Sequence, residues 1–285
     1  MTITSQRINT NGIYLDVHQA GPASGELVIL LHGFPEHGMA WEAQIEFLAS
    51  QGYRVWAPDQ RGYAGSDKPQ GAMDYQTHIL ALDIIGLADA AGAESFHLVG
   101  HDWGAAVAWI LASNHAQRLK KLVILNVPHP TAFLQCLKSD FRQVKRSWYM
   151  FAFLLPKFPE WLLRRKNYRY MRNAIVKTAV HGTFSQDQIN HYLRLWSQPQ
   201  AISSMVNWYR AGLRKPSQPR LAKVPVPVRI IWGRKDPFLL EDLAELSLSY
   251  CEDGEVTYLD QAGHWLAHEA ADTVNELILS FIQTA

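Results

Sequence analysis

Short apolar runs alternate with longer segments of helical spacing along most of this 285-residue chain. Runs of four to seven mainly apolar residues that are bounded by Gly or Pro are typical of strands buried on both faces of a parallel sheet. This alternation predicts an α/β fold with a mostly parallel central sheet and helices on both of its faces. The apolar runs cover residues 13–18, 26–32, 53–57, 96–99, 122–125, 228–232 and 256–259, and helical spacing is clearest over 75–91 and 103–113.

Residues 131–217 interrupt this alternation. They contain no clear apolar strand, and their 15 Lys and Arg residues against 3 Asp and Glu give the segment a net charge of +12. We therefore expect a helical cap over 131–217, inserted into a core domain formed by 1–130 and 218–285. Its charge is typical of a solvated face. Weak contact between the basic cap and a membrane surface is the alternative interpretation.

The overall composition sets limits on partners and location. The net charge of +1 favours no nucleic-acid partner. Cys136 and Cys251 are too few for a disulfide framework and form no ligand motif, which favours a reduced compartment. The N-terminus alternates polar and apolar residues like a strand, without the pattern of a signal peptide, and no run of 18 apolar residues predicts a membrane span. We expect a cytoplasmic monomer or homodimer.

The sharpest motif is the turn Gly100-His101-Asp102-Trp103-Gly104, which joins an apolar run to a helical segment. Glycines on both sides of a central residue are typical of a nucleophile elbow, with Asp102 where serine usually stands. The turn presents the central side chain at the carboxyl edge of the sheet, and the positive end of the following helix favours its ionised form. The alternative interpretation is a simple helix N-cap, for which Asp is a preferred residue.

Two later motifs supply partners for Asp102 in the order nucleophile, acid, histidine. Asp236 follows the apolar run at 228–232, and His264 follows the run at 256–259. We predict that His264 is the general base on water and that Asp236 orients its imidazole. Asp242 and Asp260 are the rival candidates for the acid.

A carboxylate nucleophile favours attack on a saturated carbon rather than on a carbonyl. Asp102 needs no deprotonation, and it would form an alkyl ester that water then hydrolyses. The oxyanion of that second step needs N–H donors, for which we predict the backbone groups of Phe34 and Trp103. Gly33 allows the backbone to approach closely. Epoxides and alkyl halides are the substrates that suit this chemistry.

These residues resemble the epoxide hydrolases of the α/β-hydrolase fold family over nearly the whole chain. The resemblance implies conversion of a small apolar epoxide and water to a vicinal diol, as in detoxification, without a metal or organic cofactor. It also implies a cis peptide bond between Phe34 and Pro35. The motifs are His-Gly-Phe-Pro-Glu at 32–36, Asp-Gln-Arg-Gly-Tyr at 59–63 with Ser-Asp-Lys-Pro at 66–69, Gly-His-Asp-Trp-Gly at 100–104, Asn-Val-Pro-His-Pro at 126–130 and Gly-His-Trp at 263–265.

The resemblance further implies two cap tyrosines that protonate the epoxide oxygen. Tyr209, in Asn-Trp-Tyr-Arg at 207–210, matches one, and Tyr149, seven residues before Pro156, fits the other. Packing in the cap is the alternative role for any of these tyrosines, and the substitutes for the proposed pair are Tyr168, Tyr170 and Tyr192. We expect aromatic side chains to line the substrate site, namely Phe34, Trp41, Trp103, Trp148 and Trp265.

Two other functions compete with this interpretation. A haloalkane or haloacid dehalogenase shares the Asp nucleophile, but Phe34 stands where haloalkane dehalogenases usually carry Asn, and Trp103 replaces the Arg of fluoroacetate dehalogenases. A catalytically silent small-molecule receptor is the second alternative. An intact set of Asp102, Asp236 and His264 disfavours it.

Overall fold

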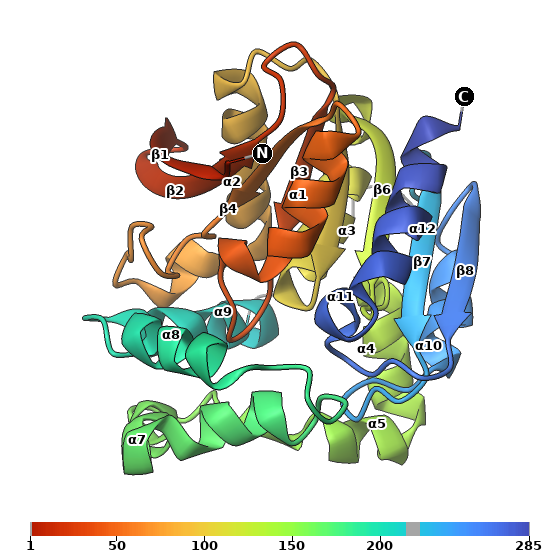
Figure 1. Ribbon diagram of the computed structural model, residues 1–285. Coiled ribbons are helices and arrows are strands. Elements are labelled where there is room, and N and C mark those ends of the chain that lie inside the picture. Colours follow the sequence, from red (N-terminus) through yellow and green to blue (C-terminus); the bar gives the residue numbers. More distant parts are fainter. Residues whose placement is uncertain (1, 215–222, 285) are drawn as a thin grey trace.

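An eight-stranded sheet forms the centre of the molecule (Figure 1), in a computed structural model that describes residues 2–214 and 223–284. Its strand order is β1-β2-β4-β3-β5-β6-β7-β8. The six strands from β3 to β8 are parallel, whereas β1 and β2 are antiparallel to their neighbours. The predicted mostly parallel sheet is therefore confirmed. The strands are β1 (Thr4–Thr10), β2 (Ile13–Ala20), β3 (Leu27–Leu31), β4 (Arg54–Pro58), β5 (Phe96–His101), β6 (Leu119–Leu125), β7 (Val228–Gly233) and β8 (Gly254–Leu259).

Helices cover both faces of this sheet because successive residues of its apolar strands point to opposite sides. In β3, Val28 and Leu30 face one apolar core, and Ile29 and Leu31 face the other. Helices α1 and α12 cover the first face, and α2 and α3 the second (Figure 1). The helices outside the cap are η1 (Gly38–Trp41), α1 (Glu42–Ser50), η2 (Ala72–Tyr75), α2 (Thr77–Ala90), α3 (Trp103–Asn114), η3 (Ala116–Arg118), α10 (Asp242–Leu248), α11 (Leu266–Glu269) and α12 (Ala271–Gln283).

The N-terminal residues form a hairpin rather than one alternating stretch. β1 pairs with β2 from Thr4 opposite Gln19 to Thr10 opposite Ile13. Asn11 and Gly12 make the turn with φ of 45° and 77°. An Asn-Gly pair between two strands is a strong hairpin signal, because both turn residues need positive φ. This signal could have divided the N-terminal pattern into two strands.

The regular elements described between β6 and β7 are helices joined by loops. Figure 1 shows these helices across the carboxyl ends of the parallel strands, with α5 and α7 farthest from the sheet. We keep the name cap for residues 131–217, whose predicted end lies outside the described residues. No helix in the described part of the chain has the length and apolar content needed to cross a bilayer. The helices are α4 (Pro130–Ser139), α5 (Phe141–Arg146), α6 (Trp148–Ala152), α7 (Phe158–Val176), α8 (Gln186–Trp196) and α9 (Ala201–Arg214).

Candidate active site

Asp102 occupies a tight turn between β5 and α3, with φ of 49° and ψ of −125°. Close contacts explain the glycines on either side of it. A Cβ on Gly104 would lie 2.2 Å from the carbonyl oxygen of Leu31, and one on Gly100 would lie 2.7 Å from the Cα of Ala105. The turn therefore depends on both glycines, and it holds the Asp102 side chain at the carboxyl edge of the sheet.

The Asp102 carboxylate is partly buried, with 18% of its side chain exposed, and it has several polar partners. Its Oδ1 accepts a hydrogen bond from the Phe34 N–H at 2.6 Å, and its Oδ2 lies 3.7 Å from Nε2 of His264. Burial raises the pKa of this carboxyl, but His264 and the Trp103 N–H lower it by a larger amount. The pKa of Asp102 is therefore below its ordinary value. The carboxylate is therefore ionised at neutral pH. The predicted donors Phe34 and Trp103 both serve this side chain.

His264 lies between two carboxylates. Its Nδ1 is 2.8 Å from Oδ2 of Asp236, on the side opposite Asp102. The N–H groups of Phe238 and Leu239 donate to Oδ1 of Asp236 at 2.7 and 3.0 Å. Burial lowers the pKa of His264, but the two carboxylates outweigh it and raise the pKa to about 10. The imidazole is therefore charged at neutral pH.

The two rival acids lie elsewhere. Asp242 and Asp260 are both 75% exposed at their side chains. Asp242 pairs with Arg142 at 3.4 Å, and Asp260 pairs with Arg234 at 2.8 Å. The structure thus brings only Asp236, of the three predicted candidates, to the imidazole of His264.

The two predicted tyrosines face the same space as Asp102 and His264. Tyr149 comes from α6 and Tyr209 from α9, and their ring centroids are 6.1 Å apart. Burial raises the pKa of both hydroxyls, and the charge of Asp102 adds to this effect. Both hydroxyls therefore keep their protons at neutral pH, as a proton donor requires.

The three substitute tyrosines are placed less well for proton donation. Tyr192 donates to Glu36 at 2.9 Å, away from the nucleophile. Tyr168 packs on Trp196, with 6.1 Å between the ring centroids. Tyr170 lines part of the site but is 54% exposed. The geometry therefore favours Tyr149 and Tyr209 as the proton donors.

Two cavities, of about 150 and 210 Å³, meet at the nucleophile. The smaller one extends past Trp103 between α3 and α4 and is mainly aliphatic beyond that residue. The larger one extends along the cap and is lined by aromatic residues that include Phe34, Trp148 and Trp265. Their mostly apolar walls suit an apolar ligand. The residues common to both cavities are Asp102, Tyr149, Tyr209, Phe238 and His264.

A family model described as alpha/beta hydrolase fold matches residues 26–271 of the chain. The chain belongs to this family. The α/β hydrolase is 43% identical to the AB hydrolase superfamily protein YfhM of Bacillus subtilis, over 99% of this chain and 98% of that protein. It is 31% identical to epoxide hydrolase 4 of Homo sapiens, over 97% of this chain and 78% of the human protein.

Solved structures give the same result for the α/β hydrolase. An epoxide hydrolase from Bacillus megaterium in complex with an inhibitor superposes with a TM-score of 0.90 at 30% identity, over 98% of this chain and all of that one. An epoxide hydrolase from metagenomes of hot environments matches with a TM-score of 0.89 at 32% identity, over the full length of both chains. The predicted resemblance to epoxide hydrolases of this fold is confirmed.

One predicted lining residue of the α/β hydrolase is wrong. Trp41 is 1% exposed and lines neither cavity. It ends the short helix η1 and packs with Ile45 and Leu48 of α1 in the core on the other side of the sheet. The structure therefore gives Trp41 a role in stability rather than in substrate binding. Residues Phe34, Trp103, Trp148 and Trp265 do line the cavities.

Sequence reasoning missed Asn126 as a site residue of the α/β hydrolase. Its side-chain amide donates to Oδ2 of Asp236 at 2.6 Å and to the carbonyl of Gly263 at 3.0 Å. Its Oδ1 accepts the N–H of Gly233 at 2.6 Å. This side chain connects the loop of the acid to the loop of the histidine. Its position directly after an apolar run was the available signal.

A second missed group lies behind His264. Glu36 is buried and accepts hydrogen bonds from Tyr192 at 2.9 Å and from His268 at 2.7 Å. His101 lies 3.6 Å from the same carboxylate through Nδ1 and donates through Nε2 to the carbonyl of His264 at 2.8 Å. Burial raises the pKa of Glu36, but the two neighbouring histidines hold it well below the ordinary value. The network fixes the backbone that carries the imidazole.

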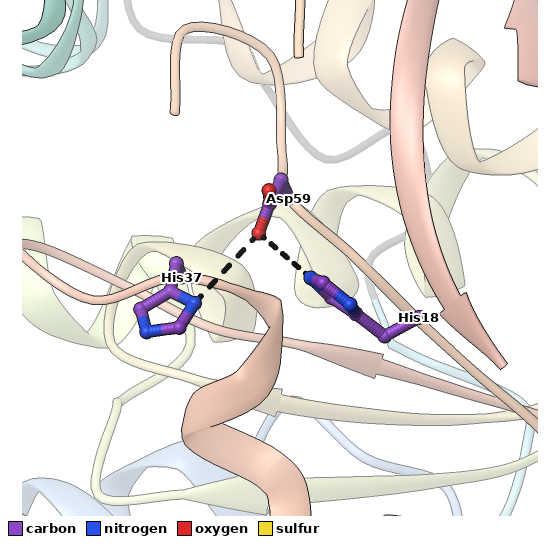
Figure 2. Close-up of side chains that lie close together, drawn as sticks. All are labelled: His18, His37 and Asp59. Atoms are coloured by element: carbon purple, nitrogen blue, oxygen red, sulfur yellow. Dashed lines mark hydrogen bonds and ion pairs between the residues drawn. The ribbon is translucent and has the colours of Figure 1, made fainter. Parts of the chain in front are cut away.

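One cluster of the α/β hydrolase has the spacing of a metal site, namely His18, His37 and Asp59 (Figure 2). Its potential ligand atoms lie within 4.8 Å of one another. Protein groups already occupy them, since Gly38 and Gly65 donate their N–H groups to Asp59, and a backbone N–H donates to Nδ1 of His37. His18 lies 3.3 Å from Asp59. We interpret the cluster as a structural ion pair, away from both cavities.

Proposed function

We propose that this α/β hydrolase converts an epoxide to a vicinal diol through a covalent ester on Asp102. One observation carries the proposal. The Asp102 carboxylate, two protonated tyrosines and the His264 imidazole border the same apolar space. The partners of the reaction are therefore a small apolar epoxide and water. A B. megaterium epoxide hydrolase of the same fold binds its product, a propane-1,2-diol, which supports this substrate class.

The first step forms the ester. The Asp102 oxygen that Phe34 does not hold attacks one ring carbon, and the bond between that carbon and the epoxide oxygen breaks. Tyr149 or Tyr209 donates its proton to the departing oxygen, which becomes a hydroxyl group. This donation matters because an alkoxide is a poor leaving group in an apolar space. General acids of this kind contribute about 10²- to 10⁴-fold to a rate.

The second step releases the diol and depends on a change of charge. Esterification removes the negative charge of Asp102, one of the two charges that raise the pKa of His264. The imidazolium then gives up its proton, which returns through solvent to the tyrosine that protonated the epoxide oxygen, and the neutral imidazole deprotonates water. The hydroxide attacks the ester carbonyl carbon, and the N–H groups of Phe34 and Trp103 stabilise the oxyanion. The bond between this carbon and the ester oxygen then breaks, and His264 returns a proton to the departing diol oxygen. Each donor of this kind contributes about 2.7–4 kcal/mol.

A single turnover in heavy-oxygen water tests the proposal. The enzyme, in excess over a styrene-type epoxide, should place the label in Asp102 and release an unlabelled diol, which peptide and product mass spectrometry can show. Labelled diol should appear only on later turnovers. Label in the first diol, without label in Asp102, would contradict the covalent mechanism. The matched control is Asp242→Asn, which alters a carboxyl outside the site and should keep the labelling pattern.

We also propose the division into a core (1–130 and 218–285) and a cap (131–217), because α6 and α9 of the cap carry the two tyrosines. A cytoplasmic location is supported by Cys136 and Cys251, which are buried free thiols. Either a monomer or a homodimer is consistent with a site whose described residues all come from one chain. The reaction uses only side chains, backbone N–H groups and water.

A further inference from the structure

The cap carries most of the exposed large apolar side chains of the described chain. The described chain has twelve exposed large apolar residues, and nine of them lie within 141–180. Five of them follow one another on α6, the next turn and the start of α7. We call them the cap patch: Trp148 (63% exposed), Phe151 (46%), Leu155 (50%), Phe158 (46%) and Trp161 (54%). Single exposed apolar residues are ordinary, but a group of them marks an interaction surface.

Positive charge surrounds the cap patch. Residues 141–180 contain ten Lys or Arg residues and one acid, Glu160, which pairs with Arg210 at 2.6 Å. The Arg165 guanidinium lies 4.7 Å from the ring of Trp161. Within the described part of the chain, no ion pair is found for the exposed residues Lys145, Lys157, Arg164, Arg165 and Lys166. The apolar residues therefore lie among cations that lack a counter-charge from the protein.

The cap patch continues into the proposed substrate site. Trp148 belongs to the patch and also lines the larger cavity, together with Leu162 and the exposed Tyr170. The same cavity reaches Asp102. A molecule that enters beside Trp148 thus passes from the patch to the nucleophile. Figure 1 shows α7 at the outer limit of the cap, among the helices farthest from the sheet.

We propose that the cap patch docks on the surface of an anionic lipid bilayer. Large apolar side chains flanked by Lys and Arg are typical of segments that lie in the interface between headgroups and acyl chains. Each cation near an anionic membrane surface strengthens binding about fivefold. A second copy of this chain fits less well, because a symmetric contact would bring two strongly basic faces together. Docking places the cavity mouth where apolar epoxides accumulate.

Vesicle sedimentation of the full chain, without substrate, tests this docking. The protein should sediment with vesicles of phosphatidylcholine and phosphatidylglycerol at low salt, and much less with phosphatidylcholine alone. Salt should release it, because screening shortens the reach of the charges. Arg164→Gln with Arg165→Gln should weaken binding about 25-fold. Phe158→Ser with Trp161→Ser should weaken it about tenfold or more.

Matched variants on the core provide the control. Lys120→Gln with Lys223→Gln removes two exposed cations, and Tyr14→Ser with Met73→Ser removes two exposed apolar side chains. Both should bind vesicles like the parent protein. Absence of sedimentation at low salt, or equal losses in core and cap variants, would overturn the proposal. So would dimers, seen by analytical ultracentrifugation, that the Phe158 and Trp161 changes dissociate. The measurement uses no epoxide, so its failure and a failure of the proposed reaction are distinguishable.

Discussion

Replacement of Asn126 tests whether this side chain holds the acid and histidine loops together. Asn126 is fully buried, and its three hydrogen bonds join Asp236, Gly233 and Gly263. Its φ of 53° adds a second requirement, because most side chains are strained in this region. Asn126→Ala removes all three hydrogen bonds and keeps a Cβ at the strained position. Asn126→Gly removes the same bonds but relieves the strain.

The expected cost follows from these contacts. A buried backbone group that loses its partner costs about 1–3 kcal/mol, and a hydrogen bond to a charged group contributes about 1.5–3 kcal/mol. Two backbone groups and one carboxylate are affected, so Asn126→Gly should lower the free energy of unfolding by at least about 3.5 kcal/mol. Asn126→Ala should cost about 1 kcal/mol more. These losses are large beside a typical total of about 5–15 kcal/mol.

Urea unfolding measures both variants, and pre-steady-state kinetics separates the two chemical steps. Ester formation on Asp102 should keep most of its rate, whereas ester hydrolysis should slow, because only hydrolysis needs the His264 that Asp236 orients. A loss of less than about 1 kcal/mol in either variant would refute the structural reasoning. A Gly variant less stable than the Ala variant would refute the strain argument.

Three further predictions address the nucleophile and its surroundings. Tyr209→Phe should lower kcat/KM for epoxides about 10²-fold or more in steady-state assays, whereas a dehalogenase would lose little turnover on haloalkanes. Burial lowers the pKa of His264, but two carboxylates raise it to about 10, so the ion pairs of this imidazole should stabilise the fold fully below pH 6.5, and this contribution should be lost as pH rises toward 10. Urea unfolding at several pH values should show a smaller loss of unfolding free energy with rising pH in Asp102→Asn than in the parent. Gly104→Ala should unfold at lower urea concentration than the parent, because its Cβ would lie 2.2 Å from the Leu31 carbonyl oxygen.

The triad could be predicted because it depends on few features of the chain. Asp102, Asp236 and His264 each follow an apolar run, and parallel strands bring their carboxyl ends to one edge of a sheet. Trp41 could not be placed in this way. Trp41 comes several residues after the apolar run at 26–32, and the short helix η1 determines which side of the sheet its ring faces. The apolar pattern of the sequence alone does not predict the path of this short helix.

The supporting hydrogen bonds were also beyond prediction. Glu36 belongs to the motif at 32–36, but its partners Tyr192 and His268 are 156 and 232 positions away along the chain. Asn126 contacts Asp236 across 110 positions. Such pairs depend on how the cap and the loops pack against each other. A single sequence gives the residue types but not which distant residues come into contact. The main strands depend on local apolar pattern and were therefore predicted well.

The two cavities that meet at Asp102 have a stereochemical consequence. An epoxide with groups on both ring carbons must place one arm in the aliphatic cavity and the other in the aromatic cavity. Its mirror image, held by the same tyrosines, must exchange the arms or offer the other carbon to the carboxylate. The preference between enantiomers thus depends on how well the two substituents of the epoxide fit the two different cavities. Residues such as Met150 on one side and Phe153 on the other become the positions at which handedness of the product can be tuned.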